Sequence, residues 1–111
     1  MDCLFCRIID GTIPSDVVYQ DEYVIAFRDV NPQAPVHVLF VPKVHVSRFS
    51  QLKDRDIQTA IFRAVSEYTE REGLEEDGYR LVVNTGAHGQ QTVDHLHVHL
   101  LAGRQLQWPP G

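Results

Sequence analysis

The sequence lacks the features that mark several large classes of protein. It contains no cluster of basic residues, and 10 Lys and Arg against 15 Asp and Glu give a net charge of −5. This balance argues against a nucleic-acid partner, because the phosphate backbone attracts basic surfaces. No apolar run reaches the roughly 20 residues that a membrane-spanning helix needs. We also find no repeat and no low-complexity linker, so we expect one domain over residues 1–111 and no membrane partner.

Cysteine is scarce, since the chain has only Cys3 and Cys6. A disulfide framework would need more cysteines, and a pair three residues apart favours a metal or redox site in a reducing compartment. The first residues also lack the basic and long apolar regions of a secretory signal. We therefore expect a cytoplasmic protein.

The hydrophobic pattern predicts an α+β fold. Residues 57–68 carry an apolar stripe with helical spacing, preceded by Asp54 and followed by Gly73, so a long helix is expected there. A short helix is predicted at 5–9. Strand patterns occupy residues 17–20, 23–27, 37–41 (stopped by Pro42), 79–84 and 93–101. These elements indicate a five-stranded antiparallel sheet with one long and one short helix, followed by a proline-rich tail at 103–111.

The most informative segment is the run in which His95, His97 and His99 alternate with Leu96, Val98 and Leu100. In a strand, residues two apart share a face and lie about 6.6 Å from each other. The apolar residues would face the core, and a one-residue slip would bury the imidazoles. We therefore expect three rings in a row on the other face. Metal ligation and nucleophilic attack on phosphorus are the two chemistries that such a row permits.

The pattern His-x-His-x-His followed by two apolar residues resembles the histidine-triad superfamily, and the chain is most similar to its Hint branch. Matching segments precede the triad in order at 26–37, 41–45, Asn84 and 91–93, and the ending Trp108-Pro109-Pro110-Gly111 resembles the Hint C-terminus. The resemblance implies a hydrolase that cleaves the P–N bond of purine nucleoside 5′-phosphoramidates, with acyl-nucleotides as possible further substrates.

The resemblance also implies catalytic roles. His97 would be the nucleophile that forms a nucleotidyl-histidine intermediate, which requires a neutral ring with one free nitrogen. His99 would contact the α-phosphate and stabilise the charge that develops there. His37 would pack beside the triad, where a satisfied core histidine is an equal alternative. Thr92 would donate its hydroxyl to a phosphate oxygen or to the leaving group.

Binding roles follow from the same resemblance. Asp29 would accept the ribose hydroxyls, and Trp108 would help to choose the leaving group. Thr92 stands where Ser is frequent in this branch, and the family usually has a small residue at position 90. Phosphate binding is implied for Asn84, Gly89, Gln90, Gln91 and Thr92, and the walls of the base pocket, or plain core, for Phe5, Ile8, Phe27 and Val30.

The spacing of Cys3 and Cys6 is typical of zinc sites, and a structural zinc takes four ligands, often two Cys and two His. Some triad proteins with this N-terminal pair bind zinc through two further histidines, which match His45 and His95. The resemblance therefore implies a structural zinc on these four residues. Two buried thiols of no special role and a redox pair are the alternatives, and the second lacks its usual strand–helix context.

Three other functions stay open. A dinucleoside polyphosphate hydrolase of the Fhit type shares the triad, although the ending Trp108-Pro109-Pro110-Gly111 argues against it. A nucleotide-binding adaptor with incidental activity and a hydrolase with zinc on His97 and His99 are the others. No paired carboxylates suggest a Mg²⁺ site, so the chemistry is expected to need no cofactor.

The family is dimeric, with two sheets joined edge to edge and residues 103–111 extending to the partner's active site. The resemblance therefore implies a homodimer. Such pairing would also cover an otherwise exposed strand edge.

Overall fold

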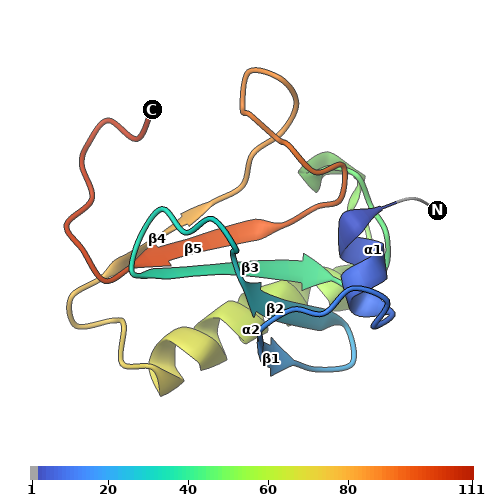
Figure 1. The fold of residues 1–111 in the computed structure, drawn as a ribbon, viewed down its shortest axis with the longest axis horizontal. Helices are drawn as coiled ribbons and strands as arrows, with labels where there is room; N and C mark the ends of the chain where they lie inside the picture. Colours follow the sequence, from blue (N-terminus) through green and yellow to red (C-terminus); the bar gives the residue numbers. More distant parts are fainter. Residues whose placement is uncertain (1–2) are drawn as a thin grey trace.

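A computed structural model describes residues 3–111 and confirms the predicted α+β architecture (Figure 1). One antiparallel sheet holds five strands in the order β1-β2-β3-β5-β4. Their bounds are Val17–Gln20 (β1), Val24–Arg28 (β2), Val36–Pro42 (β3), Tyr79–Val82 (β4) and Val98–Ala102 (β5). The helices are α1 (Leu4–Ile9), α2 (Arg55–Arg71) and a 3-10 turn, η1 (Phe49–Gln51). No helix within residues 3–111 has the length and apolar character needed to cross a bilayer.

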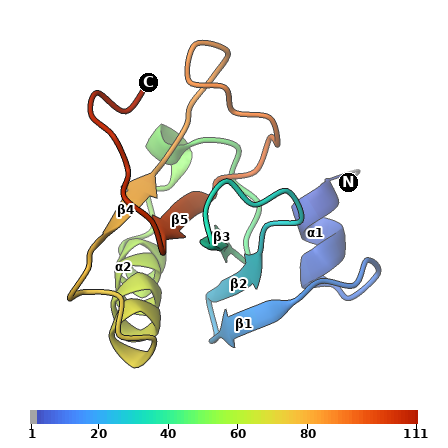
Figure 2. The same ribbon diagram turned by 60° about the vertical axis from the view of Figure 1, so that its left-hand side comes forward.

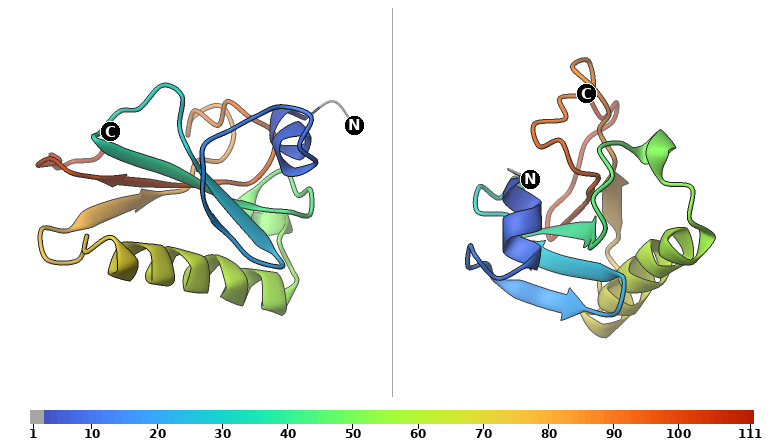
Figure 3. Two further views of the ribbon diagram at one scale, coloured as in Figure 1. Left: turned by 60° about the horizontal axis from the view of Figure 1, so that its bottom comes forward. Right: turned by 90° about the vertical axis from the view of Figure 1, so that its right-hand side faces the viewer.

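The long helix α2 covers one face of the sheet, as the views in Figures 2 and 3 show. It begins after Asp54, whose carboxylate accepts hydrogen bonds from the backbone N–H groups of Asp56 and Ile57. Its apolar stripe packs on the sheet, and the ring of Tyr68 meets that of Phe40 on β3 edge to face. This is the larger of the two core clusters. It contains Leu96, Val98 and Leu100, so these three side chains do face the core as the alternation predicts.

The short helix α1 lies on the opposite face, near the ends of β2 and β3 (Figure 3, left). Its Phe5 joins a second cluster with Ile25 and Phe27 of β2 and Leu39 and Val41 of β3. Both faces of the sheet therefore carry apolar cover. The sequence pattern predicted a histidine face outside the core, and in this respect it was wrong: His95 is 0% exposed and His97 is 5% exposed.

The last strand is shorter than the predicted 93–101, because β5 begins only at Val98. Its pairing with β3 ends at Phe40 and Val98. The next residue of β3 in line with Leu96 is Pro42, which has no backbone N–H to offer, and its carbonyl accepts a hydrogen bond from His95 Nε2. The backbone N–H of Leu96 bonds the carbonyl of Val46 instead. His95 and His97 therefore lie in the irregular segment before β5, and only His99 lies within it.

Other boundaries differ from the prediction by one or two residues. β2 and β3 each extend one residue further than expected, to Arg28 and Pro42, because Val24 to Arg28 pair in register with Pro42 to Val38. Pro42 is tolerated as the terminal residue of β3. β4 ends at Val82 rather than at 84, because its antiparallel partner β5 begins only at Val98 and the last pair of the ladder is Val82 with His99.

Candidate active site and metal centre

Two of the three triad histidines line a cavity on the α1 side of the sheet. The cavity has a volume of about 260 Å³, and both His97 and His99 contribute to its wall. His99 lies on β5 beside Leu39 of β3, which in turn lies beside Phe27 of β2, so one row of residues across the sheet forms the floor. The rings of His97 and His99 meet edge to face with their centroids 4.9 Å apart. The predicted sharing of one face is therefore confirmed for these two.

The hydrogen bond of His97 fixes which of its nitrogens carries the proton. Its Nδ1 lies 2.8 Å from the carbonyl oxygen of His95, and a carbonyl only accepts, so Nδ1–H must donate. The neutral ring then has an unprotonated Nε2. Within residues 3–111 this atom has no hydrogen-bond partner, and no buried side-chain nitrogen lacks one, so Nε2 is open to the cavity. A free imidazole nitrogen on a cavity wall is the requirement for a nucleophile.

A second chain of hydrogen bonds fixes His37 and His99. The backbone N–H of Gln33 donates to His37 Nδ1 over 3.0 Å, which leaves the proton of the neutral ring on Nε2. His37 Nε2 lies 2.9 Å from His99 Nδ1 and donates to it. The proton of a neutral His99 then resides on Nε2. His37 is thus buried and acts on His99 rather than lining the cavity.

Burial keeps both of these rings neutral. It lowers the pKa of His37, against the opposing effect of the Asp29 carboxylate. Burial first, and then the neighbouring His97 and His37, lowers the pKa of His99 to about 4. At neutral pH, His99 is therefore a hydrogen-bond donor through Nε2–H and carries no net positive charge.

The predicted ribose acceptor, Asp29, also lines the cavity, half-buried at the end of β2. Its Oδ1 accepts a hydrogen bond from the backbone N–H of Asn31, and its Oδ2 lies 3.4 Å from His37 Nε2. The backbone N–H of Asp29 donates to the carbonyl of His37, which anchors this corner to β3. An anchored carboxylate at a cavity wall suits the binding of paired hydroxyl groups.

The four residues expected to wall the base pocket, Phe5, Ile8, Phe27 and Val30, all line the cavity. Phe5 and Phe27 also belong to the second core cluster, and their rings meet edge to face. Phe5 contacts the ring of His97 in the same manner, at a centroid distance of 5.1 Å. Val30 is 100% exposed, so it stands at the mouth. Phe5 and Phe27 therefore belong both to the core and to the wall of the cavity, so the expectation and its alternative both hold for these two residues.

Only part of the loop expected to bind phosphate lines the cavity. Thr92 lines it, whereas Asn84, Gly89, Gln90 and Gln91 do not. Gln91 instead braces the loop, because its side-chain amide donates to the carbonyls of Ser47 and Val93 and its oxygen accepts from the N–H of Gly86.

Two positions in the same loop carry a backbone constraint. A Cβ at Gly89 would lie 2.7 Å from the Thr85 carbonyl oxygen, so only glycine fits there. Gln90 has a φ of 59°, a left-handed conformation that costs a residue with a Cβ about 1 kcal/mol relative to glycine.

Trp108 does not line this cavity within its own chain. It is 80% exposed, and the guanidinium of Arg80 lies over its ring at 5.9 Å. The structure also adds wall residues that the sequence analysis did not name. The place of Leu39 in the wall could have been predicted from the alternation of side chains along β3, because Leu39 lies on the same face of this strand as His37. No sequence pattern indicated the other wall residues. They lie on α1, on the loop after it, on β2 or before β5: Leu4, Ile13, Pro14, Ser15, Arg28 and Val93.

The four residues expected to bind zinc come together beside the active site. One donor atom from each of Cys3, Cys6, His45 and His95 lies within 4.8 Å of the others. His95 Nε2 donates to the carbonyl of Pro42, so its Nδ1 is unprotonated, and that atom lies 3.4 Å from Cys3 Sγ, 3.6 Å from Cys6 Sγ and 3.1 Å from His45 Nδ1. Tetrahedral zinc would separate its ligands by about 3.3 Å between nitrogens and about 3.6 Å between nitrogen and sulfur. The donor set therefore fits a structural zinc ion.

Burial first, and then the neighbouring Cys3 sulfur, raises the pKa of Cys6. A cation at the centre of the four donors would reverse that effect by stabilising the thiolate. His95, the third histidine of the row, thus directs its unprotonated Nδ1 at the other three metal-binding donors and not at the cavity.

A family model described as "HIT domain" matches residues 10–106. The "14 kDa zinc-binding protein" of Zea mays is 49% identical, with 97% of this chain and 87% of that protein aligned. The "Purine nucleoside phosphoramidase" of Escherichia coli is 44% identical over 95% of this chain and 90% of its own length. The "Adenylylsulfatase HINT1" of Arabidopsis thaliana is 46% identical over 97% and 76%.

A solved structure from Legionella pneumophila, named as a HIT family hydrolase, superposes with a TM-score of 0.94 at 46% identity. The alignment covers 99% of this chain and 100% of that one. The family model includes the row of histidines, and the relatives and this structure span nearly the whole chain. The chain therefore belongs to the HIT domain family and is a HIT family hydrolase.

Proposed function

We propose that this protein hydrolyses the P–N bond of purine nucleoside 5′-phosphoramidates through a covalent intermediate on His97. The observation that supports this most strongly is the fixed tautomer of His97, whose Nδ1–H donates to the His95 carbonyl while Nε2 is open to the cavity. The name of the Escherichia coli relative supports the substrate class. Phe5 and Phe27 provide apolar rings for a base, and Asp29 provides an acceptor for the ribose hydroxyls.

The reaction runs in two displacements at the same phosphorus. His97 Nε2 attacks the α-phosphorus, a new N–P bond forms, and the P–N bond to the amine breaks as the amine leaves with a proton taken from solvent water. His99 Nε2–H donates to a phosphate oxygen on which negative charge develops, and the hydroxyl of Thr92, which lines the same cavity, would assist. A water molecule then attacks the phosphorus, the bond to His97 breaks, and the nucleoside monophosphate is released.

The metal centre serves structure in this proposal. Cys3, Cys6, His45 and His95 would hold Zn²⁺, which would join α1 to the segment after β3 and to the segment before β5. This fixes His95, whose carbonyl holds the tautomer of His97. The name of the Zea mays relative supports zinc as the ion. The two free thiols are also consistent with the cytoplasmic location that we propose.

A second substrate class is favoured by one observation, the name of the Arabidopsis thaliana relative, which is an adenylylsulfatase. In adenylyl sulfate the α-phosphorus bears a sulfate leaving group in place of an amine. Attack by His97 would give the same intermediate, so the two activities differ only in what leaves.

Trapping of the covalent intermediate tests both proposed substrates, the phosphoramidate and adenylyl sulfate. We expect acid-free rapid quenching after mixing with adenosine 5′-phosphoramidate to yield protein heavier by one adenylyl group, with the label on His97 by peptide mass analysis. Parallel reactions with adenylyl sulfate and a diadenosine polyphosphate rank the leaving groups by rate. Two displacements retain the configuration at phosphorus, so inversion with a substrate chiral at phosphorus, together with absence of any adduct, would show that water attacks phosphorus directly.

We also propose a homodimer joined through β4. This strand is the edge of the sheet, and an apolar groove of about 470 Å³ lies between it and α2. Phe62 on α2 is 75% exposed and Leu81 on β4 is 42% exposed, and both line this groove. Pairing of two β4 edges would satisfy the unpaired backbone groups and cover these side chains. It would also carry residues 103–111 towards the partner, where Trp108 would contact the leaving group.

Sedimentation equilibrium is expected to give twice the mass of the chain. Leu81→Arg should shift the protein to a monomer, because a buried charge would lie opposite its own copy across the interface. Val17→Arg, on the strand β1 at the other edge of the sheet, is the matched control and should remain dimeric. A wild-type monomer at micromolar concentration would contradict the proposal.

A further inference from the structure

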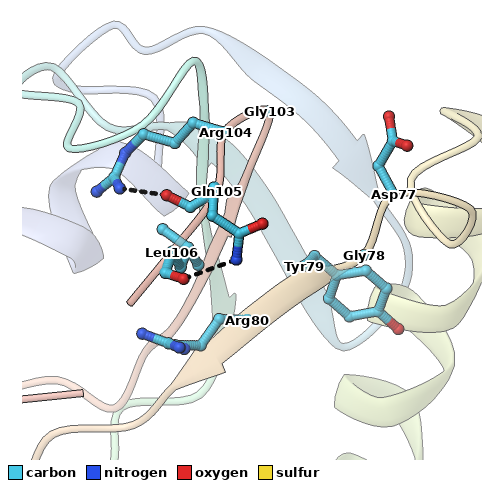
Figure 4. A pocket seen from close by; sticks show the side chains of 8 residues that line it. All are labelled: Asp77, Gly78, Tyr79, Arg80, Gly103, Arg104, Gln105 and Leu106. Carbon is cyan, nitrogen blue, oxygen red and sulfur yellow. Dashed lines mark hydrogen bonds between the residues drawn. The ribbon is translucent and has the colours of Figure 1, made fainter. Parts of the chain in front are cut away.

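The side chain of Arg104 joins the C-terminal tail to the loop between β2 and β3. Its Nε and one terminal nitrogen both donate to the carbonyl of Gln33, over 3.2 and 3.0 Å. The other terminal nitrogen donates to the carbonyl of Gln105, as Figure 4 shows. All three guanidinium nitrogens of Arg104 are therefore used. Such a planar fork holds its acceptors in a defined direction. The loop position of Gln33 is therefore set from the tail.

The same residue, Gln33, sets the tautomer of the buried histidine pair. Its backbone N–H donates to His37 Nδ1, and His37 Nε2–H donates in turn to His99 Nδ1. If Gln33 moved away, His37 could carry its proton on Nδ1, and Nε2 would then become an acceptor. His99 would have to place its own proton on Nδ1 to keep the bond, which would remove the Nε2–H that faces the cavity.

A second contact packs the C-terminal tail closely against the loop between β2 and β3. Gly103 has a φ of +94°, and a Cβ there would lie 2.9 Å from Cβ of Pro35. The chain thus turns sharply at Gly103 and passes directly over the loop before Arg104 reaches Gln33. Arg104 itself is exposed, and its hydrogen bonds extend the contact between tail and loop from Pro35 to Gln33.

From these contacts we propose that Arg104 is a positioning residue for the active site: by holding Gln33, it keeps the His37–His99 pair in the tautomer that presents a proton to the substrate. The inference rests on the proposed function for its effect on rate, and on the hydrogen-bond chain alone for its effect on the histidines. It places the tail of each chain in control of a catalytic group of that same chain.

The direct test observes the tautomers in the substrate-free protein. In ¹⁵N-labelled wild type, two-bond ¹H–¹⁵N spectra are expected to show His37 and His99 protonated at Nε2. Arg104→Ala should give a mixture of tautomers at His37. It should also lower kcat about tenfold, the worth of one hydrogen bond in the transition state, with a smaller change in KM. Arg104→Lys keeps one donor for the Gln33 carbonyl and should restore the wild-type spectrum in large part.

Arg80→Ala is the matched control. Arg80 also holds the tail, through the carbonyl of Gln107 and the ring of Trp108, but it does not touch the loop. It should leave the His37 tautomer unchanged. A single Nε2–H tautomer at His37 in Arg104→Ala, or the same mixture in both variants, would overturn the inference. A mixture in Arg104→Ala alone, in a protein whose wild type does not cleave nucleotides, would uphold the hydrogen-bond chain and reject the proposed function.

Discussion

Replacing His97 by alanine is expected to lower kcat by about 10⁴-fold or more, as loss of a covalent nucleophile commonly does. His97 is the histidine of the row whose cavity-facing nitrogen has a lone pair, because its Nδ1–H is committed to the His95 carbonyl. His99 presents a proton instead, and His95 points its free nitrogen at the cysteine pair. Alanine removes the attacking atom and leaves the apolar walls and Asp29 in place.

Steady-state hydrolysis of adenosine 5′-phosphoramidate measures this, with calorimetric titration of AMP as the control for binding. AMP should still bind to His97→Ala with an affinity near that of the wild type. The matched histidine control is His88→Ala, since His88 is exposed and lies outside the cavity wall. If His97→Ala kept most of the wild-type rate, His97 would not be the nucleophile.

Loss of the metal is the second large effect, and it is expected on stability. Cys6→Ser, or treatment of the wild type with a strong chelator, should release one zinc per chain and lower the melting temperature by about 10 °C or more. The estimate corresponds to the loss of about 3 kcal/mol in a chain of this size, a modest fraction of what structural zinc contributes in small domains. Activity should fall as well, because Cys3 caps α1 and Cys6 lies within it, and the same helix carries Phe5, which contacts the His97 ring.

Zinc content by mass spectrometry and thermal melting provide the two readouts. The chelator should have no further effect on Cys6→Ser, because the site is already broken, whereas His88→Ala should respond to it as the wild type does. If purified wild type contained no zinc and Cys6→Ser melted at the wild-type temperature, the four donors would be a polar core and the metal proposal would fail. Restoration of the melting temperature by added Zn²⁺ after chelation would exclude irreversible damage.

Much of the fold follows from local pattern. The apolar stripe from Ile57 to Tyr68 predicts α2 because helical spacing places these residues on one side, and Asp54 marks its start. Alternation in the histidine segment correctly assigns Leu96, Val98 and Leu100 to the core under α2. The family roles of Asp29, His37 and the triad come from resemblance, and the structure brings these residues into one place.

Other features depend on contacts that no local pattern encodes. The strand β5 begins late because Pro42, more than fifty residues earlier in the chain, cannot continue the ladder and accepts from His95. The burial of His97 depends on α1 folding over the far side of the sheet. The spacing of the donors in the metal group, and the wall residues from the loop after α1, likewise arise from segments distant in sequence.

The sequence by itself determined that His97 and His99 share a side of the chain, because side-chain alternation is a property of extended backbone, and it determined that two cysteines and two further histidines were available to a metal. Only the tertiary structure decided what each ring can do. The position of one proton on an imidazole is set by whichever acceptor or donor lies against its other nitrogen. For His97 and His37 those partners are the carbonyl of His95 and the amide of Gln33, near neighbours in sequence whose orientation depends on the folded backbone. For His95 the partner is the carbonyl of Pro42, which only the fold brings within reach.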